Sequence, residues 1–214
     1  MMNKFLMIVI ALFSVSLSFA QNNQAKNTLD AVSKKYDGYN TIESTFTYKV
    51  IQENAEEISD QGKLYLNKSQ NKYKIILPTQ ELISDGKSVW SVLKEDKEVQ
   101  VSDADNNAQA IGPNNIFTFY RSGYKYTAKA DEQVSGEGKL KVIELSPLNV
   151  SSNYAKIKLR VNKNNHIHDV TIYDKSGSKY IYAIKNLYVN DSIDDSNFQF
   201  NKSKYPSFEV VDLR

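Results

Sequence analysis

Apolar residues near the start of the chain repeat with the spacing of an amphipathic helix. The apolar stripe consists of Ala25, Leu29, Val32 and Tyr36, and the charged residues away from it are Lys26, Asp30, Lys34 and Lys35. One apolar face of this kind is typical of a helix that packs against another layer. Asp37-Gly38 then supplies a stop signal. The pattern predicts a helix over residues 27–36 that lies on a sheet.

From Ser44 onward the apolar period changes to two, which is the repeat of a β-strand with one buried face. The alternating or apolar segments are residues 44–50, 63–67, 72–77, 82–84, 89–93, 98–101, 124–128, 141–145, 155–161, 167–173 and 179–187. Short polar turns link most of them, and Gly86 in Asp85-Gly86-Lys87 suits a tight hairpin turn. Consecutive strands with turn-length links predict an antiparallel meander.

A second helix is predicted where Gly112-Pro113-Asn114 precedes the aromatic-rich stretch from Ile116 to Tyr120. Proline and asparagine are favourable at a helix start. Residues 198–214 are expected to form one more strand and a tail, interrupted by Pro206. The predicted fold is therefore mostly β: one large, strongly curved antiparallel sheet with two helices over one face.

Residues 1–20 have the features of a cleavable secretory signal peptide. Lys4 supplies positive charge, residues 5–19 are apolar apart from three serines, and Ser18-Phe19-Ala20 is a small-x-small cleavage site. The run is short for a membrane span, and no later stretch reaches the roughly 18 apolar residues that a span requires. We expect residues 1–20 to be removed and residues 21–214 to form a single soluble exported domain; a retained N-terminal anchor is the alternative.

Composition argues against several classes of protein. The chain has 27 basic and 25 acidic residues, without the basic excess typical of a nucleic-acid-binding protein. The absence of cysteine excludes disulfides, a cysteine nucleophile and a lipidated cysteine at the cleavage site. The two histidines, His166 and His168, have no obvious third ligand, so we expect no metal site. We expect neither catalysis nor a cofactor.

Apolar surface remains as the candidate functional feature. Two helices are too few to cover every strand of the predicted sheet, so the concave face should be only partly filled. A cavity lined by aliphatic and aromatic side chains with few polar groups is typical of a lipid site. For each single residue, membership of an ordinary core is the competing explanation.

Several segments together resemble the LolA family of outer-membrane lipoprotein carriers. They are the helix from Thr28 to Tyr36, the strand from Ser44 to Val50, Gly62-Lys63-Leu64 with its basic strand end, the hairpin from Ile83 to Trp90, the strand end from Val142 to Pro147, the strand from Lys158 to Val161, and Phe198-Gln199-Phe200. The hairpin, which is similar to the family's "SDGK-x-x-W", is the most specific of them. The resemblance covers nearly all of residues 21–214.

This resemblance implies an incomplete β-barrel with a helical lid. It implies a periplasmic chaperone that takes lipoproteins from an inner-membrane lipoprotein-releasing ABC transporter to the outer membrane, where an acceptor is a further expected partner. The acylated lipoproteins themselves are the expected cargo, the protein is expected to be a monomer, and no nucleic acid is expected to bind.

The strand alternation and the expected lid give candidate sites, and the choice of sheet face stays open because a slip of one residue in register would reverse it. The expected lipid-binding residues are Phe46, Tyr48, Val50, Leu64, Leu66, Tyr73, Ile75 and Trp90. The expected lid residues are Leu29, Val32, Ile116 and Phe117. Many family members have Arg-Pro where this chain has Lys68-Ser69, and that arginine holds the lid. Lysine lacks the bidentate fork of arginine, so Lys68 is either a weaker latch or an ordinary solvated lysine.

Two alternatives to lipoprotein transport stay open at this point. The same cavity suits a periplasmic carrier of another lipid or glycolipid. It also suits a lipid-sensing interaction module.

Overall fold

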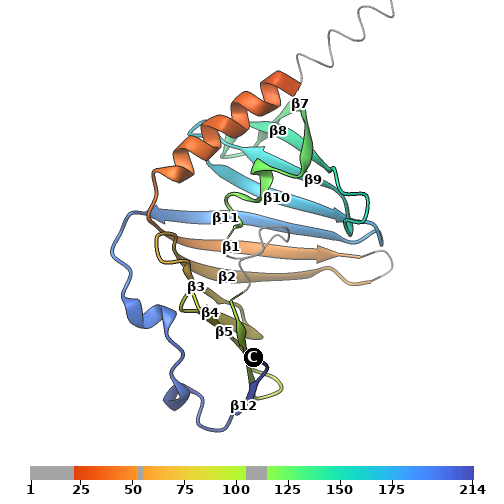
Figure 1. Cartoon of the computed structure of the whole chain (residues 1–214). Helices are drawn as coiled ribbons and strands as arrows, with labels where there is room; N and C mark the ends of the chain where they lie inside the picture. The colour runs from red at the N-terminus through yellow and green to blue at the C-terminus, as the bar shows by residue number, and fades with distance from the viewer. Residues whose placement is uncertain (1–21, 53–54, 105–114) are drawn as a thin grey trace, which may run out of the picture.

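The part of the chain that the structure describes folds into one open sheet of twelve strands with a single α-helix against its concave face (Figure 1). A computed structural model describes residues 22–52, 55–104 and 115–214. The predicted signal peptide and the predicted helix start at Gly112-Pro113-Asn114 lie outside these residues. No helix of the described part is long and apolar enough to cross a membrane.

The helix covers residues 22–37 and is longer than the predicted one. The strands are β1 (Thr41–Ile51), β2 (Ile58–Asn67), β3 (Lys72–Ile76), β4 (Gln80–Ser84), β5 (Ser88–Leu93), β6 (Glu98–Asp103), β7 (Tyr124–Val134), β8 (Gly138–Pro147), β9 (Tyr154–Val161), β10 (Ile167–Asp174), β11 (Lys179–Val189) and β12 (Glu209–Asp212). Three short 3-10 turns occupy Phe119–Arg121, Asp195–Phe198 and Lys202–Lys204.

The sheet order is β12-β6-β5-β4-β3-β2-β1-β11-β10-β9-β8-β7. In this order, every pair of neighbouring strands is antiparallel except the first pair. In that pair, β12 lies parallel to β6. β1 pairs with β2 on one side and with the distant β11 on the other, so it joins two meanders of consecutive hairpins. The two ends of this order do not pair with each other, which confirms the predicted open, curved, mostly β sheet.

Strand alternation gives β7 to β10 an apolar inner face and an outer face that carries charged side chains. On β9, Ile157 and Leu159 are fully buried on the inner face, while Lys158 and Arg160 point outward. Figure 1 shows the helix across the half of the sheet that contains β7 to β10. Leu29, buried to 4% exposure, belongs to the same core as these inner residues.

Two secondary-structure predictions were wrong. The predicted second helix is an irregular turn at residues 115–118 followed by the single 3-10 turn Phe119–Arg121. Its aromatic residues still pack inward, with Phe119 and Tyr120 buried. The end of the chain is not a simple strand and tail, because residues 190–208 run over the outer face of β3 to β5 before β12 forms.

The Asp85-Gly86-Lys87 hairpin turn was predicted correctly. Gly86 has φ of +92°, where an L side chain is strained, and a Cβ there would lie 2.7 Å from the carbonyl oxygen of Gln70. The Asp85 carboxylate accepts hydrogen bonds from the amides of Lys87 and Ser88. Residue choice and turn geometry therefore agree at the most specific motif of the sequence.

Candidate functional site: an apolar cavity under the helix

An apolar cavity of about 400 Å³ lies on the concave face of the sheet. Phe46 of β1 and Leu64 of β2 contribute to one side of it, and Ile172 of β10 and Ile184 of β11 to the other. These side chains share a face because the register pairs Phe46 with Ile184, so that inward positions line up across the strands. The lining is aliphatic and aromatic with few polar groups, which is the composition of a site for an acyl chain.

A second hollow of about 350 Å³ adjoins the first along the strands. Phe46, Ile75, Tyr180 and Tyr182 line both. The second hollow is also lined by Tyr48 and other side chains that lie near the end of β1, the start of β11 and the turn between β3 and β4, including Val50, Leu77 and Leu82. The two hollows form one groove, defined here as the cavity groove.

Gly62 explains how a phenylalanine lies flat on this face. Gly62 is directly opposite Phe46 in the β1–β2 pair. A Cβ atom on Gly62 would come within 2.4 Å of the Cζ atom of Phe46 and 2.7 Å of the Cδ2 atom of Leu77. Because any side chain at position 62 would displace the ring, the Gly-x-Leu motif serves the shape of the cavity groove.

The structure brings most of the predicted lipid-binding residues to the cavity groove, but not all of them. Phe46, Tyr48, Val50, Leu64 and Ile75 line it. Two other predicted residues, Leu66 and Tyr73, face the same side of the sheet, but they are buried in the core at 2% and 9% exposure, away from the groove lining.

Trp90 lies on the opposite face of the sheet from the cavity groove. It pairs with Ile83, whereas the inward-facing Leu82 pairs with Ser91. The indole stacks on Phe200 of the C-terminal segment, with ring centroids 5.9 Å apart. Since neighbouring residues of a strand point to opposite faces, this register removes Trp90 from the candidate site.

The predicted lid residues divide into two layers. Leu29 and Val32 of the helix are buried in the core at 4% and 0% exposure. Ile116 and Phe117 of the turn lie beneath and line the cavity directly. Tyr36 connects the two layers, because its ring stacks on Phe117 at a centroid distance of 4.8 Å. The sequence pattern placed Tyr36 on the apolar stripe but gave no sign of this contact.

Lys68 lies at the C-terminal end of the helix. Its Nζ donates hydrogen bonds to the carbonyl oxygens of Tyr36 at 2.5 Å and Tyr39 at 2.9 Å. The last carbonyls of a helix lack partners within the helix and carry a partial negative charge, so a cation is favoured there. Burial lowers the pKa of Lys68, nearby Asp37 acts in the opposite direction, and Arg121 lowers it further. This is the geometry that a latch between strand and helix requires.

A second contact ties the helix to the turn over the cavity. Arg121 forms an ion pair with Asp37 in the last turn of the helix at 2.6 Å and reaches the carbonyl oxygen of Ser33 at 3.4 Å. The hydroxyl of Ser33 also lies 3.4 Å from that of Tyr120. Neither Arg121 nor Asp37 was predicted as part of the lid, because the sequence does not show which loop lies beside the helix.

The two histidines face different partners. His166 lies with its Nε2 atom 2.7 Å from the Tyr39 hydroxyl, and burial, with a smaller effect of Lys35, lowers its pKa. His168 instead bonds to the Asp169 carboxylate through Nδ1. Among the described residues, no group of three or more histidine, aspartate or glutamate side chains is placed to hold a metal ion.

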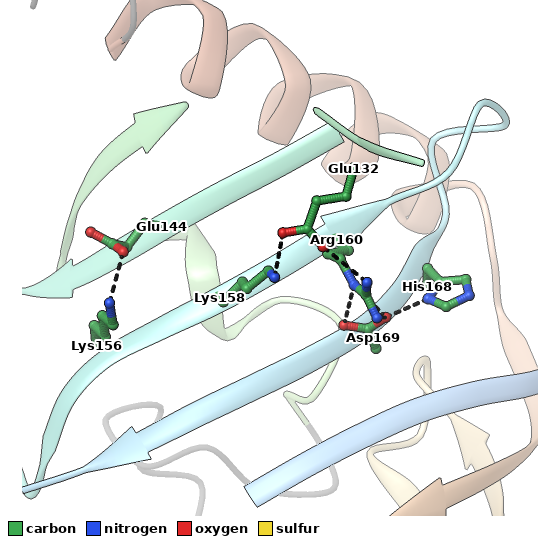
Figure 2. A network of polar contacts seen from close by, with 7 residues as sticks. All are labelled: Glu132, Glu144, Lys156, Lys158, Arg160, His168 and Asp169. Atoms are coloured by element: carbon green, nitrogen blue, oxygen red, sulfur yellow. Dashed lines mark hydrogen bonds and ion pairs between the residues drawn. The ribbon is translucent and has the colours of Figure 1, made fainter. Parts of the chain in front are cut away.

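The outer face of β7 to β10 carries a network of ion pairs (Figure 2). Arg160 forms ion pairs with both Asp169 and Glu132, the latter at 3.0 Å. The Asp169 side chain is only 1% exposed. Lys158 also pairs with Glu132, at 2.5 Å. Hydrogen bonding to Asp169 raises the pKa of Arg160, and hydrogen bonding to Lys158 lowers that of Glu132. On β7 to β10 the outer face thus carries ion pairs, whereas the outer face of β4 to β6 is apolar, with Ile83, Val92 and Val99 buried.

Comparison with known proteins places this fold and cavity in context. No curated protein matches the sequence. A conserved uncharacterized protein from Thermus thermophilus is similar in structure, with a TM-score of 0.59, 12% identity, and coverage of 88% of this chain and 99% of that one. This similarity concerns the fold alone.

Two further solved structures are similar at lower scores. A LolA superfamily protein from Nitrosomonas europaea has a TM-score of 0.43 and 13% identity over 82% of this chain and 97% of its own. A putative outer membrane lipoprotein-sorting protein domain from Vibrio parahaemolyticus has a TM-score of 0.44 and 15% identity over 85% of this chain and 99% of its own.

The model of the family "Outer membrane lipoprotein carrier protein LolA" matches residues 37–201. The match contains the strands that line the cavity groove, from β1 through β11. The chain belongs to the LolA family.

Proposed function

We propose that the protein is a periplasmic chaperone that carries lipoproteins from the inner to the outer membrane with their acyl chains in the cavity groove. The LolA-like fold already indicates a carrier that binds lipoproteins or lipids rather than an enzyme. The proposal that lipoproteins are the cargo rests on the apolar cavity of about 400 Å³. The cavity lies beneath a helix whose C-terminal end is bonded to Lys68. Export by the predicted signal peptide belongs to the same proposal.

The energetics of an exposed lipid explain why such a carrier is needed. Each methylene removed from water contributes about 0.8 kcal/mol, so three long acyl chains exposed together cost tens of kcal/mol. A lipoprotein therefore cannot cross an aqueous compartment unaided. The carrier must hide most of this surface and still release it at the outer membrane.

The lid provides a way to release the cargo. Ile116 and Phe117 occupy one end of the cavity when the lid is closed. The first hollow, at about 400 Å³, is small beside two or three long acyl chains. We therefore expect a lipoprotein to displace Phe117 and to loosen the helix when it loads. When the cargo leaves, these side chains return and their burial offsets part of the lost lipid contact.

The expected partners follow from this cycle. An inner-membrane ABC transporter that releases lipoproteins is the proposed donor. An acceptor in the outer membrane, or that membrane itself, is the proposed recipient. No cofactor takes part in the proposed cycle.

Depletion of the protein in its native host tests the transport proposal. Lipoproteins of the outer membrane are expected to accumulate in the inner membrane, as measured by membrane fractionation. If they remain in the outer membrane, lipoprotein transport is not the function. Native mass spectrometry of the protein from its own periplasm then distinguishes a bound lipoprotein from a glycolipid.

A charge in the cavity tests the assignment of the site. Ile184→Glu places a carboxylate on the cavity wall, and Tyr188→Glu places the same charge on the outer face of the same strand, where Tyr188 is 53% exposed. We expect loss of lipoprotein transfer only in Ile184→Glu, with circular dichroism confirming that both variants fold. Ile184→Trp, which fills the cavity without a charge, is expected to lower transfer as well. Normal transfer by both Ile184 variants would contradict the assignment.

A further inference from the structure

Four tyrosines gather along the cavity groove, and none is explained by apolar lining alone. They are Tyr48, Tyr154, Tyr180 and Tyr182, and they are called the tyrosine cluster below. Tyr48 and Tyr182 are a cross-strand pair of β1 and β11, with stacked rings whose centroids are 6.5 Å apart. Tyr180 and Tyr182 line both hollows, Tyr154 lines the first and Tyr48 the second.

The hydroxyls of the cluster differ from those of three other inward tyrosines. Tyr36, Tyr39 and Tyr126 bond to the amide of Ile167, to His166 and to the carbonyl of Tyr120, respectively. Within residues 22–52, 55–104 and 115–214, the structure shows no hydrogen bond to any hydroxyl of the cluster.

A half-buried phenol without a protein partner has its hydrogen-bonding capacity free for a ligand. Buried tyrosine hydroxyls usually find a partner, since an unpaired one loses the free energy of its hydrogen bond to water. All four rings of the cluster are partly buried, and the structure has no fully buried side-chain oxygen or nitrogen without a partner among the described residues. The cluster hydroxyls therefore keep some exposed surface, and their side chains line the groove.

The electrostatics of this region favour an uncharged ligand group. Burial raises the pKa of Tyr182, and its neighbours Tyr180, Tyr154 and Tyr48 raise it further, so the phenol stays neutral. Asp174, which pairs with Tyr154 across β9 and β10, also lines the cavity. Hydrogen bonding from Ser176 lowers the pKa of Asp174, so this solvated carboxylate is ionised at neutral pH and exerts a screened repulsion on an anionic headgroup beside it.

The first hollow of the groove is more polar at one end than at the other. The cluster, with Asn153 and Asp174, lies toward the end of β10 and the starts of β9 and β11. Ile116, Phe117 and Ile167 line the part beneath the helix. An acyl chain that enters with its methyl end under Phe117 brings its polar end to the cluster.

We infer that the tyrosine cluster binds the uncharged ester groups of the diacylglyceryl moiety of a lipoprotein, and so fixes the direction in which the acyl chains enter. This inference rests on the proposed function. Ester carbonyls accept hydrogen bonds from phenols, and the rings themselves provide apolar contact for the first methylenes. The cluster thereby supplies orientation, which an apolar cavity alone does not.

Removal of single oxygen atoms tests the inference. The double variant Tyr180→Phe/Tyr182→Phe keeps both rings and removes two hydroxyls, and Tyr188→Phe on the outer face is the matched control. The probes are a synthetic dipalmitoylglyceryl-cysteine peptide and pyrene, a fluorescent hydrocarbon without polar atoms. One neutral hydrogen bond contributes about 1 kcal/mol, or roughly fivefold in affinity. We expect the double variant to bind the lipopeptide at least about tenfold more weakly and to bind pyrene unchanged.

Each outcome decides between the inference and the function on which it rests. Equal lipopeptide affinity of wild type and double variant overturns the role of the cluster and leaves the lipoprotein carrier intact. Parallel loss of pyrene binding also overturns it, because the change then affects the cavity and not the ester contact. If the wild type binds dipalmitoylphosphatidylglycerol as tightly as the lipopeptide, the preference for an uncharged group is overturned. If the wild type binds neither lipid nor pyrene, the proposed function falls as well.

Discussion

Replacement of Lys68 by methionine tests whether the helix at residues 22–37 is a lid that opens. Methionine keeps an unbranched side chain and removes the charge. The variant loses the two hydrogen bonds from Nζ to the carbonyl oxygens of Tyr36 and Tyr39, at 2.5 Å and 2.9 Å. Everything that packs between the helix and the sheet stays in place.

The latch is the smaller of the two forces that hold the helix. Hydrogen bonds to a charged group contribute about 1.5–3 kcal/mol each, but water reaches Lys68, and screening reduces the sum to roughly 1–2 kcal/mol. Burial of Leu29, Val32 and Tyr36 contributes about 1.5–3 kcal/mol for each side chain, or about 5–9 kcal/mol together. Loss of the latch therefore leaves the lid closed most of the time and raises its open population about 5- to 30-fold.

Hydrogen–deuterium exchange resolved by peptide measures this population. We expect exchange in residues 22–37 of Lys68→Met to accelerate by about the same factor, with little change in β8 to β10. Lys68→Arg should restore slow exchange, since arginine keeps a cation and several donors. Lys63→Met is the control on the outer face of the same strand, where Lys63 pairs with Glu43 at 2.8 Å.

Two results would refute this reasoning. If the helix of Lys68→Met exchanges at the wild-type rate, the two hydrogen bonds do not hold it. If exchange accelerates equally in the helix and in β8 to β10, Lys68 stabilises the whole fold, and the helix does not open as a separate unit.

Three further predictions concern single residues. Gly62→Ala should displace the ring of Phe46 and destabilise the protein by about 1–3 kcal/mol, measured by urea unfolding, and an unchanged stability would contradict the close contact. His166 has a lowered pKa when folded, so its neutral form contributes stability above about pH 6.5 that is lost as the pH falls toward the folded pKa; the stability of His166→Asn should fall less than that of wild type between pH 7.5 and pH 5. Trp90 is the only tryptophan and stacks on Phe200 outside the cavity, so its emission maximum should stay constant on lipid loading, and a blue shift would place it in the groove instead.

Much of the fold was predictable because alternation with period two is a strong signal on a sheet with one buried face. The clean repeat of Ile157, Leu159 and Val161 against Lys158 and Arg160 appears unchanged in β9. The stretch after Asn115 was less predictable. Its aromatic residues are needed by the core whether the backbone is helical or not, so their presence did not fix the local conformation.

The sequence predicted which strands point apolar residues inward. It did not predict which of those residues line the groove and which are buried in the core. Phe46 and Leu66 both point inward from neighbouring strands, yet Phe46 lines the groove and Leu66 is buried in the core. That difference depends on what covers each position, and the covering residues come from distant parts of the chain. The sequence also did not show to which face of the sheet Trp90 points. The C-terminal segment covers the outer face there, so a hydrophobic residue suits either face.

The position of β1 between β2 and β11 has a kinetic consequence. Ile42 pairs with Leu66 close by and with Val189 near the other end of the chain, while the hairpins of β2 to β6 and of β7 to β11 are local. Local hairpins form quickly, and a seam between distant segments forms slowly because a long loop must close first. The groove has walls on both sides of this seam, so it exists only after the seam has closed. A newly made chain therefore has no pocket in which a lipid can lodge until almost all of its sequence is available.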